Sequence, residues 1–305
     1  MQRIKAIPSL LKAAATGWMD ANAARVAAAL AYYTLLSMAP LVVLCIAIAG
    51  FVFGETAARE HLIQQVGMLI GPQGAEALKA VVKNAHQSTS GGISSIVSIA
   101  VLLFGASAVF GELQDALNTI WGVKPKPGRP ILQIVRERLF SFSMVIGLAF
   151  LLLVSLVMST VVTALGTFMS EKLPGGEALW FILNLALSLG VNTLLFAAIF
   201  KVVPDVEVRW RDVWIGALFT AVLFSLGKQL LAWYLGTSTV ASSYGAAGSV
   251  VALVVWVYYS AQLVFLGAEF TQAYARRFGG SIEPSKNAVP IDGGDRSDTQ
   301  APARA

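Results

Sequence analysis

The stretch ALAYYTLLSMAPLVV, residues 29–43, is apolar enough to lie inside a lipid bilayer, yet five polar or helix-perturbing residues fall within nine of its positions. A segment that only anchors a protein in a membrane needs no such groups. Pro40 removes a backbone hydrogen bond and frees a carbonyl, which a membrane helix tolerates only where protein, hydroxyls or water satisfy that carbonyl. We therefore expect four of these side chains to face the interior of a helix bundle: Tyr32, Tyr33, Ser37 and Pro40. The alternative is that they only hold neighbouring helices together.

The composition around this stretch indicates an integral membrane protein. Of the 305 residues 56% are hydrophobic and only 13% are charged, and the mean hydropathy is +0.70. Soluble domains carry roughly a quarter charged residues. A helix needs about 20 apolar residues to cross a hydrocarbon core, and six segments qualify, near residues 27–53, 92–119, 139–165, 178–202, 213–235 and 245–274. The sequence thus predicts an all-α polytopic membrane protein with six transmembrane helices.

The distribution of basic residues predicts how these helices are oriented. If the N-terminus is cytoplasmic, 17 of the 22 Lys and Arg residues fall in inner segments, four in outer segments and one, Lys228, within a span. Cytoplasmic loops carry an excess of Lys and Arg, so this asymmetry places both termini inside. Tryptophans support the same boundaries, because five of the seven fall at predicted span ends: Trp121, Trp180, Trp210, Trp214 and Trp233.

Three segments flank or connect the predicted spans. Residues 1–26 have apolar side chains on one side of a helix and are expected to lie on the cytoplasmic membrane surface. The long outer connection, residues 54–90, shows helical spacing on both sides of GPQG and predicts two short amphipathic helices. Residues 279–305 are polar and rich in Gly and Pro, without periodicity, and are expected to form a disordered cytoplasmic tail.

Small and polar residues recur every three or four positions through the second predicted span: Ser94, Ser98, Val101, Gly105, Ala108, Glu112, Asp115 and Thr119. Such a stripe predicts the surface along which the helix packs closely on a neighbour. Glu112 and Asp115, three residues apart, would share one face near the inner end. Two carboxylates that close repel each other unless a cation lies opposite.

A similar stripe follows the sixth predicted span: Gly245, Gly248, Ala252, Val255, Tyr259, Gln262, Leu266 and Glu269. It also ends in a carboxylate near the inner surface. We expect the three acids Glu112, Asp115 and Glu269 to lie at the same depth as Arg25, which opens the first span. Either these groups only neutralise one another, or they form an inner gate with Arg25 or a cation or proton site, because ionisable groups in spans usually line a pathway.

Lys228 is the one basic residue within a predicted span, about fifteen residues past the inner end of the fifth. It would therefore lie in the outer half of the membrane. Its ammonium could reach the outer surface along its aliphatic stem. Because the neighbouring positions on its helix face are small, we favour burial against protein.

Four long motifs in order resemble one known family. They are AALAYYTLLSMAPLVVL in the first span, FGELQDALNTIWGV at the end of the second, VVPDVEVRWRDVWIGALFTAVLF into the fifth, and SSYGAAGSVVALVVWVYYSAQLVFLGAEFTQAY for the sixth. Together they make the chain similar, over roughly residues 15–275, to the YihY/virulence factor BrkB family. The resemblance implies six spans and a bacterial inner-membrane address. Roles proposed for the family include export or flipping of lipids or other amphipathic compounds and resistance to host killing, and its old label, ribonuclease BN, is regarded as a misassignment.

The residues argue against nuclease activity and against nucleic acid as a partner. Both histidines, His61 and His86, are predicted outside the membrane without metal-ligand spacing, and the basic loop KPKPGRP (124–130) carries no aromatic platform. No nucleotide-binding P-loop occurs, so any pumping would have to draw on a gradient or another subunit. We expect no cofactor and no metal. Membrane lipids, an amphipathic substrate and a second copy of the chain are the partners considered.

Two functions remain open from the sequence. The first is a transporter, exporter or flippase of a lipid or other amphipathic substrate, with a polar path between spans one, two, five and six. Its candidate path residues are Tyr32, Tyr33, Ser37, Pro40, Glu112, Asp115, Asn118, Lys228, Tyr244, Gly245, Tyr259, Gln262 and Glu269, with Arg25 as the partner at the inner gate. The second is a non-transporting scaffold or resistance factor that acts through protein partners.

Overall fold

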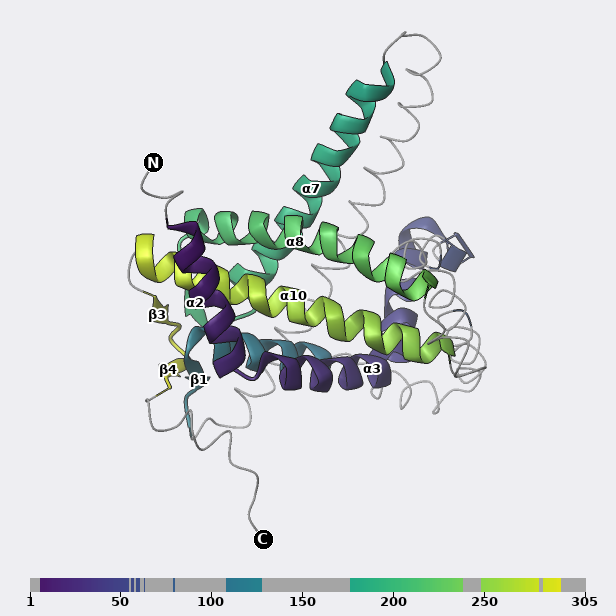
Figure 1. The fold of residues 1–305 in the computed structure, drawn as a ribbon. Coiled ribbons are helices and arrows are strands. Elements are labelled where there is room, and N and C mark those ends of the chain that lie inside the picture. Colours follow the sequence, from purple (N-terminus) through teal and green to yellow (C-terminus); the bar gives the residue numbers. More distant parts are fainter. Residues whose placement is uncertain are drawn as a thin grey trace.

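The computed structural model describes residues 6–54, 56–57, 59–60, 63, 79, 108–127, 176–237, 248–279 and 282–291, and most of these residues are helical. The helices that Figure 1 labels are α2 (Ile7–Asp20), α3 (Ala23–Phe53), α7 (Gly176–Val202), α8 (Trp210–Thr237) and α10 (Gly248–Phe278). Residues 108–121 are helical as well. Four short strands complete the described part: β1 (Val123–Pro125), β2 (Val206–Glu207), β3 (Glu283–Pro284) and β4 (Ala288–Pro290).

Four of these helices coincide with predicted spans, namely α3, α7, α8 and α10. Among the described residues, three stretches are long and apolar enough to cross a membrane: Leu185–Val202, Trp210–Leu231 and Val250–Phe278. The third predicted span, residues 139–165, and most of the outer connection lie outside the described residues. The chain is therefore a mostly helical membrane protein, and the count of six spans stays a prediction.

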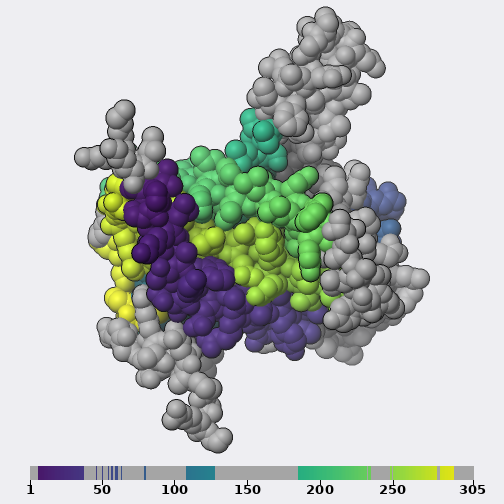
Figure 2. Space-filling model, viewed as in Figure 1, coloured from purple at the N-terminus to yellow at the C-terminus, as the bar shows by residue number. Residues whose placement is uncertain are grey.

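Helix α10 is the centre of the arrangement, because it packs against α8, α3 and α2 (Figure 1). Helix α7 packs on α8 through Phe196, Ala197 and Phe200, all buried, while its N-terminal half projects away from the other labelled helices. Helix α2 lies across the C-terminal end of α10, with one side open to the surface (Figure 2). We call this end of the molecule, where α2, residues 119–126 and the C-terminus of α10 meet, the basal end.

A sharp break separates α2 from α3. Asn22 has a left-handed backbone (φ 49°), a conformation that Asn tolerates better than most residues. Helix α2 precedes the break and lies on α10, where its buried Leu10 and Ala14 pack on Phe270 and Tyr274. Helix α2 is thus docked on α10 by one apolar side.

Helices α8 and α10 carry the same pentapeptide pattern, GALFT at 216–220 and GAEFT at 267–271. The copies pack antiparallel, so that each threonine lies on the glycine of the other helix: Thr271 on Gly216 and Thr220 on Gly267. Each threonine hydroxyl donates to the carbonyl of the glycine four residues earlier in its own helix, at 2.8 Å and 2.6 Å. We call these four residues the glycine–threonine seam. Small side chains let the backbones approach closely, which is how membrane helices associate without a hydrophobic drive.

The segment after α10 corrects one prediction. Residues 282–291, expected as part of a disordered tail, fold back across the basal end, and we call them the strap. Strand β3 pairs with β2, and β4 pairs with β1, both antiparallel. Further backbone bonds join Ile291 N–H to Gly122 O and Ser285 N–H to Asp205 O, both at 2.9 Å. Edge pairing with two distant loops orders a segment whose own composition predicts disorder. Residues 292–305 lie outside the described part.

Candidate functional site

A cavity of about 860 Å³ lies at the basal end, and we call it the basal cavity. One wall is α2 with the first turn of α3, and the opposite wall is the last three turns of α10. Thr119 and Ile120 close it on one side, and Ile291 of the strap contributes to its lining. Its volume lies within the range of roughly 300–1,000 Å³ that small-molecule sites occupy.

The lining of the basal cavity is rich in charge and predominantly basic. Among the described residues that line it, four are basic, Lys12, Arg25, Arg276 and Arg277, and two are acidic, Asp20 and Glu269. Apolar groups from α2, α3 and residue 120 lie between them. The arrangement therefore suits a ligand with an anionic group and an apolar body, because the basic groups exceed the acidic ones by two.

Glu269 is the most deeply placed of these charged groups. Its side chain is 5% exposed and lies against Gly17 of α2, where a Cβ atom would come 2.2 Å from Glu269 Oε2. One turn further along α10, Gln272 Nε2 donates to the backbone carbonyl of Ile120. About two turns beyond Glu269, Arg277 donates to the hydroxyl of Ser9. Polar contacts of α10 thus hold both α2 and the end of helix 108–121 at the cavity.

The structure brings Arg25 and Glu269 to this one cavity, but it does not bring the other two predicted acids there. Among the described residues, helix 108–121 contributes Thr119 and Ile120 to the lining, and neither Glu112 nor Asp115. Glu112 is half-buried and Asp115 is exposed. The four residues therefore do not line one cavity together, and their common depth stays a prediction.

The predicted packing stripe of the second span is also wrong where the structure describes it. The buried side of helix 108–121 is formed by Phe110, Ala116, Leu117, Asn118, Ile120 and Trp121. The stripe residues Glu112, Asp115 and Thr119 lie on the more exposed side. The large apolar residues decide which face is buried, because they remove more surface from contact with solvent or headgroups than small residues do.

Asn118 holds a polar contact that fixes the loop between α7 and α8. It is 2% exposed, donates to Asp205 Oδ2 at 2.9 Å and accepts from the Asp205 backbone N–H at 2.7 Å. Gln114 Nε2 lies 3.3 Å from both carboxylate oxygens of Asp205. Asn118, predicted as a path residue, therefore binds the loop to helix 108–121 in this structure.

The opening stretch divides between interior and surface. Ser37 is buried, whereas Tyr32 and Tyr33 are 59% and 38% exposed, with their rings in edge contact at 5.8 Å between centroids. Both tyrosines therefore differ from the prediction that they face the bundle interior, because α3 turns its small residues, such as Ala27 and Ala31, to the core. Helix α3 continues through Pro40.

The remaining path candidates lie along α8 and α10, away from the basal cavity. Lys228 is half-buried on α8. Its neighbour Gly227 lies close to Tyr259 of α10, because a Cβ atom added to Gly227 would come 3.0 Å from the Tyr259 hydroxyl. Gln262 is half-buried on α10. Tyr244 and Gly245 fall outside the described residues.

Sequence reasoning missed several residues that shape the site. Lys12, Arg276 and Arg277 were counted only as topological charges, although they line the basal cavity. The repeated pentapeptide was a visible signal for the seam. Among the described residues no group of three His, Cys, Asp or Glu side chains could hold a metal ion, and His61 and His86 lie outside them.

The sequence of this chain matches a known protein family. Residues 14–292 match the family model described as Virulence factor BrkB. The chain is 31% identical to a UPF0761 membrane protein of Pseudoalteromonas translucida, covering 79% of this chain and 78% of that protein, and 31% identical to one of Aeromonas salmonicida, covering 79% and 80%. No solved structure matches. These matches confirm the resemblance drawn from the four motifs, and the chain belongs to the virulence factor BrkB family of membrane proteins.

Proposed function

We propose that this protein is a carrier in the bacterial inner membrane for an amphipathic molecule with an anionic head group, which it takes up at the basal cavity. The observation that carries the proposal is the excess of basic side chains in a cavity of about 860 Å³ at one end of long apolar helices. By the positive-inside rule this end faces the cytoplasm. A head group held there would leave its apolar part beside the lipid-facing helices.

In this proposal α2 is the element that moves. It is connected to α3 through the left-handed Asn22, a short break that can absorb backbone rotation. Its contacts with α10 include the hydrogen bond from Arg277 to Ser9 and the close fit of Gly17 against Glu269. The α8–α10 pair, by contrast, is too closely packed at the seam to slide, so the cavity would open on the α2 side.

Arg25 and Glu269 would have different roles at the binding site. Arg25 would attract the anionic group, and Glu269, as a buried carboxylate in the same lining, would act as the counter-charge when no head group is present. The basic side chains of the cavity would thus face the carboxylate of Glu269 when the cavity is empty and the anionic head group when it is occupied. Their charge would be balanced with and without the substrate.

The test is lipid or lipid-analogue movement in proteoliposomes. With fluorescent short-chain phosphatidylglycerol and phosphatidylcholine as probes, we expect faster movement of the anionic probe. Arg25→Gln should slow that movement about tenfold or more, since a charge-assisted hydrogen bond contributes roughly 1.5–3 kcal/mol.

Arg211→Gln is the matched control, because Arg211 is an exposed arginine at the start of α8 and does not line the cavity. It removes the same charge and should leave the rate unchanged. Equal rates for protein-containing and empty vesicles with both probes would overturn the proposal and favour the scaffold.

A further inference from the structure

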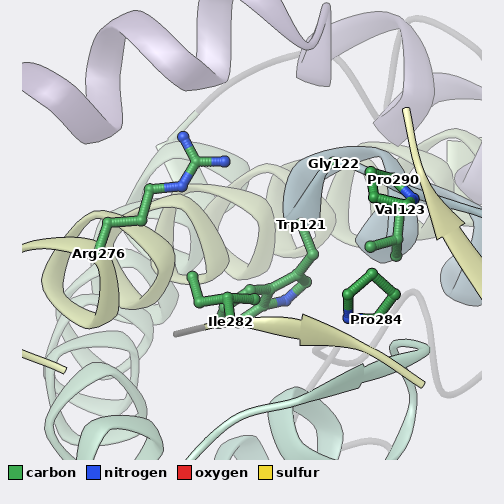
Figure 3. A pocket seen from close by; sticks show the side chains of 7 residues that line it. All are labelled: Trp121, Gly122, Val123, Arg276, Ile282, Pro284 and Pro290. Carbon is green, nitrogen blue, oxygen red and sulfur yellow. The ribbon is translucent and has the colours of Figure 1, made fainter. Parts of the chain in front are cut away.

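A second, smaller cavity of about 400 Å³ lies beside the basal cavity, on the side of the strap. It is lined by Trp121, Gly122, Val123, Arg276, Ile282, Pro284 and Pro290 (Figure 3). We call it the tryptophan pocket. Three of its residues belong to the strap, so the pocket exists only because the strap folds back onto residues 121–123.

The two polar side chains among the described lining residues, Arg276 and Trp121, are both hydrogen-bond donors. Of the described residues that line it, Arg276 is the one that carries a charge, and none is acidic. Trp121 is 2% exposed, and its Nε1–H has no acceptor among the residues that the structure describes. A buried donor without an acceptor costs roughly 1–3 kcal/mol, so a ligand oxygen that accepted from it would recover part of that cost.

The other walls are apolar and rigid. Pro284 and Pro290 belong to paired strands, and Val123 is paired directly with Pro290. Figure 3 shows the indole of Trp121 in the middle of the lining, beside Ile282, with the guanidinium of Arg276 coming from α10 on one side. Prolines on paired strands present fixed surfaces, which favours a ligand of defined shape.

We propose that the tryptophan pocket binds a small amphipathic anion, with its phosphate or carboxylate group held by Arg276, a second oxygen accepting from Trp121 Nε1–H, and its short apolar part against Pro284 and Pro290. The anion is either a soluble organic phosphate or carboxylate or the head group of a membrane lipid. This binding does not depend on the carrier function.

One consequence does rest on the proposed carrier function. Arg276 lines both cavities, so an anion in the tryptophan pocket would engage a guanidinium that also serves the basal cavity. Occupation of either site should therefore weaken anion binding at the other, by the same factor in both directions.

The test is calorimetric titration of the full-length protein in neutral detergent micelles with n-hexyl phosphate. We expect two sites, one abolished or weakened about tenfold by Trp121→Phe, which removes the donor and keeps the aromatic bulk. Trp18→Phe is the matched control, because Trp18 also carries a buried Nε1–H without an acceptor among the described residues but lines neither cavity. It should leave both sites intact.

Arg276→Gln provides a second variant in case Trp121→Phe lowers the amount of folded protein, since Arg276 is exposed. It should weaken the tryptophan pocket and, because Arg276 also lines the basal cavity, the basal site as well, whereas Arg25→Gln should weaken only the basal site. If Trp121→Phe and Arg276→Gln both bind n-hexyl phosphate as wild type does while Arg25→Gln does not, the pocket proposal fails and the carrier proposal stands. If Trp121→Phe and Arg276→Gln both weaken binding while Arg25→Gln binds as wild type does, the pocket proposal is supported and the proposed carrier site is overturned.

The same titration separates the two sources of the anion. In nanodiscs of phosphatidylglycerol, weaker binding at the Trp121-dependent site than in phosphatidylcholine discs would assign it to a lipid head group. Equal binding in both discs would assign it to a soluble anion. Binding of 1-hexanol as tight as n-hexyl phosphate would overturn the proposal, because the pocket would then recognise only the apolar part.

Discussion

The two pentapeptides of α8 and α10 differ at one position, which is apolar in α8 and charged in α10. In GALFT the third residue, Leu218, is 47% exposed on the outside of α8. In GAEFT the third residue, Glu269, is buried under α2 and lines the basal cavity. The four shared positions build the same contact twice, including the stacked rings of Phe219 and Phe270 at 4.0 Å. One face of α10 is therefore fixed by the seam, while the adjacent face is free to carry a charge.

The largest effect is expected from breaking the shared part. In Gly267→Ala the new Cβ would lie 2.0 Å from Thr220 Oγ1 and 2.8 Å from Thr220 Cβ, and the Cβ atom cannot withdraw without moving α8. We expect a loss of about 1–3 kcal/mol in the free energy of unfolding, the usual cost of overpacking. A lower melting temperature in detergent micelles measures it.

Gly190→Ala is the control for that prediction, because Gly190 lies in α7 with open space where a Cβ would be placed. Alanine there should be neutral or stabilising by up to about 1 kcal/mol, as expected for a glycine replaced within a helix. Adding Thr220→Ala to Gly267→Ala should recover part of the lost stability. Wild-type melting of Gly267→Ala would refute the close packing of the seam.

An intermediate effect is expected at the position where the copies differ. Glu269→Gln keeps the size of the side chain and removes its charge, so the seam is untouched and the melting temperature should fall less than in Gly267→Ala. Movement of the anionic lipid probe in proteoliposomes should fall about tenfold or more, the scale of one lost charge-assisted contact. Transport equal to wild type would remove Glu269 from the proposed exchange and leave it a packing residue.

The helices could be predicted from sequence because each depends on its own residues. The apolar run predicted at 178–202 became α7 (Gly176–Val202), and the one at 213–235 became α8 (Trp210–Thr237). The basic residues near the span ends were visible too. Length and hydropathy decide such segments without reference to partners.

The strap and the cavities could not be predicted, because they depend on pairings between distant residues. Strands β1 and β4 are three residues each and lie more than 160 positions apart, so neither has a periodicity that sequence reasoning can detect. The same holds for Asn118 and Asp205, whose contact requires that helix 108–121 and the α7–α8 loop be placed first. Spacing alone also favoured the wrong face of helix 108–121, since a stripe of small residues and a stripe of large ones both fit a helical period.

The smallest effect on stability is expected at Gly17, which lies against Glu269, the position where the two pentapeptides differ. In Gly17→Ala the new Cβ would lie 2.2 Å from Glu269 Oε2, nearly as close as the contact in Gly267→Ala. The obstructing atoms, however, are the end of a flexible side chain, whereas those of Thr220 are bound to the helix at Cβ. The carboxylate can therefore shift, and alanine favours the helix, so we expect a change in unfolding free energy of less than about 1 kcal/mol.

The displaced carboxylate should still alter transport of the anionic probe, and Glu269→Gln combined with Gly17→Ala should show no further change beyond Glu269→Gln alone. Additive effects of the two substitutions would mean that Gly17 acts through α2 and not through Glu269.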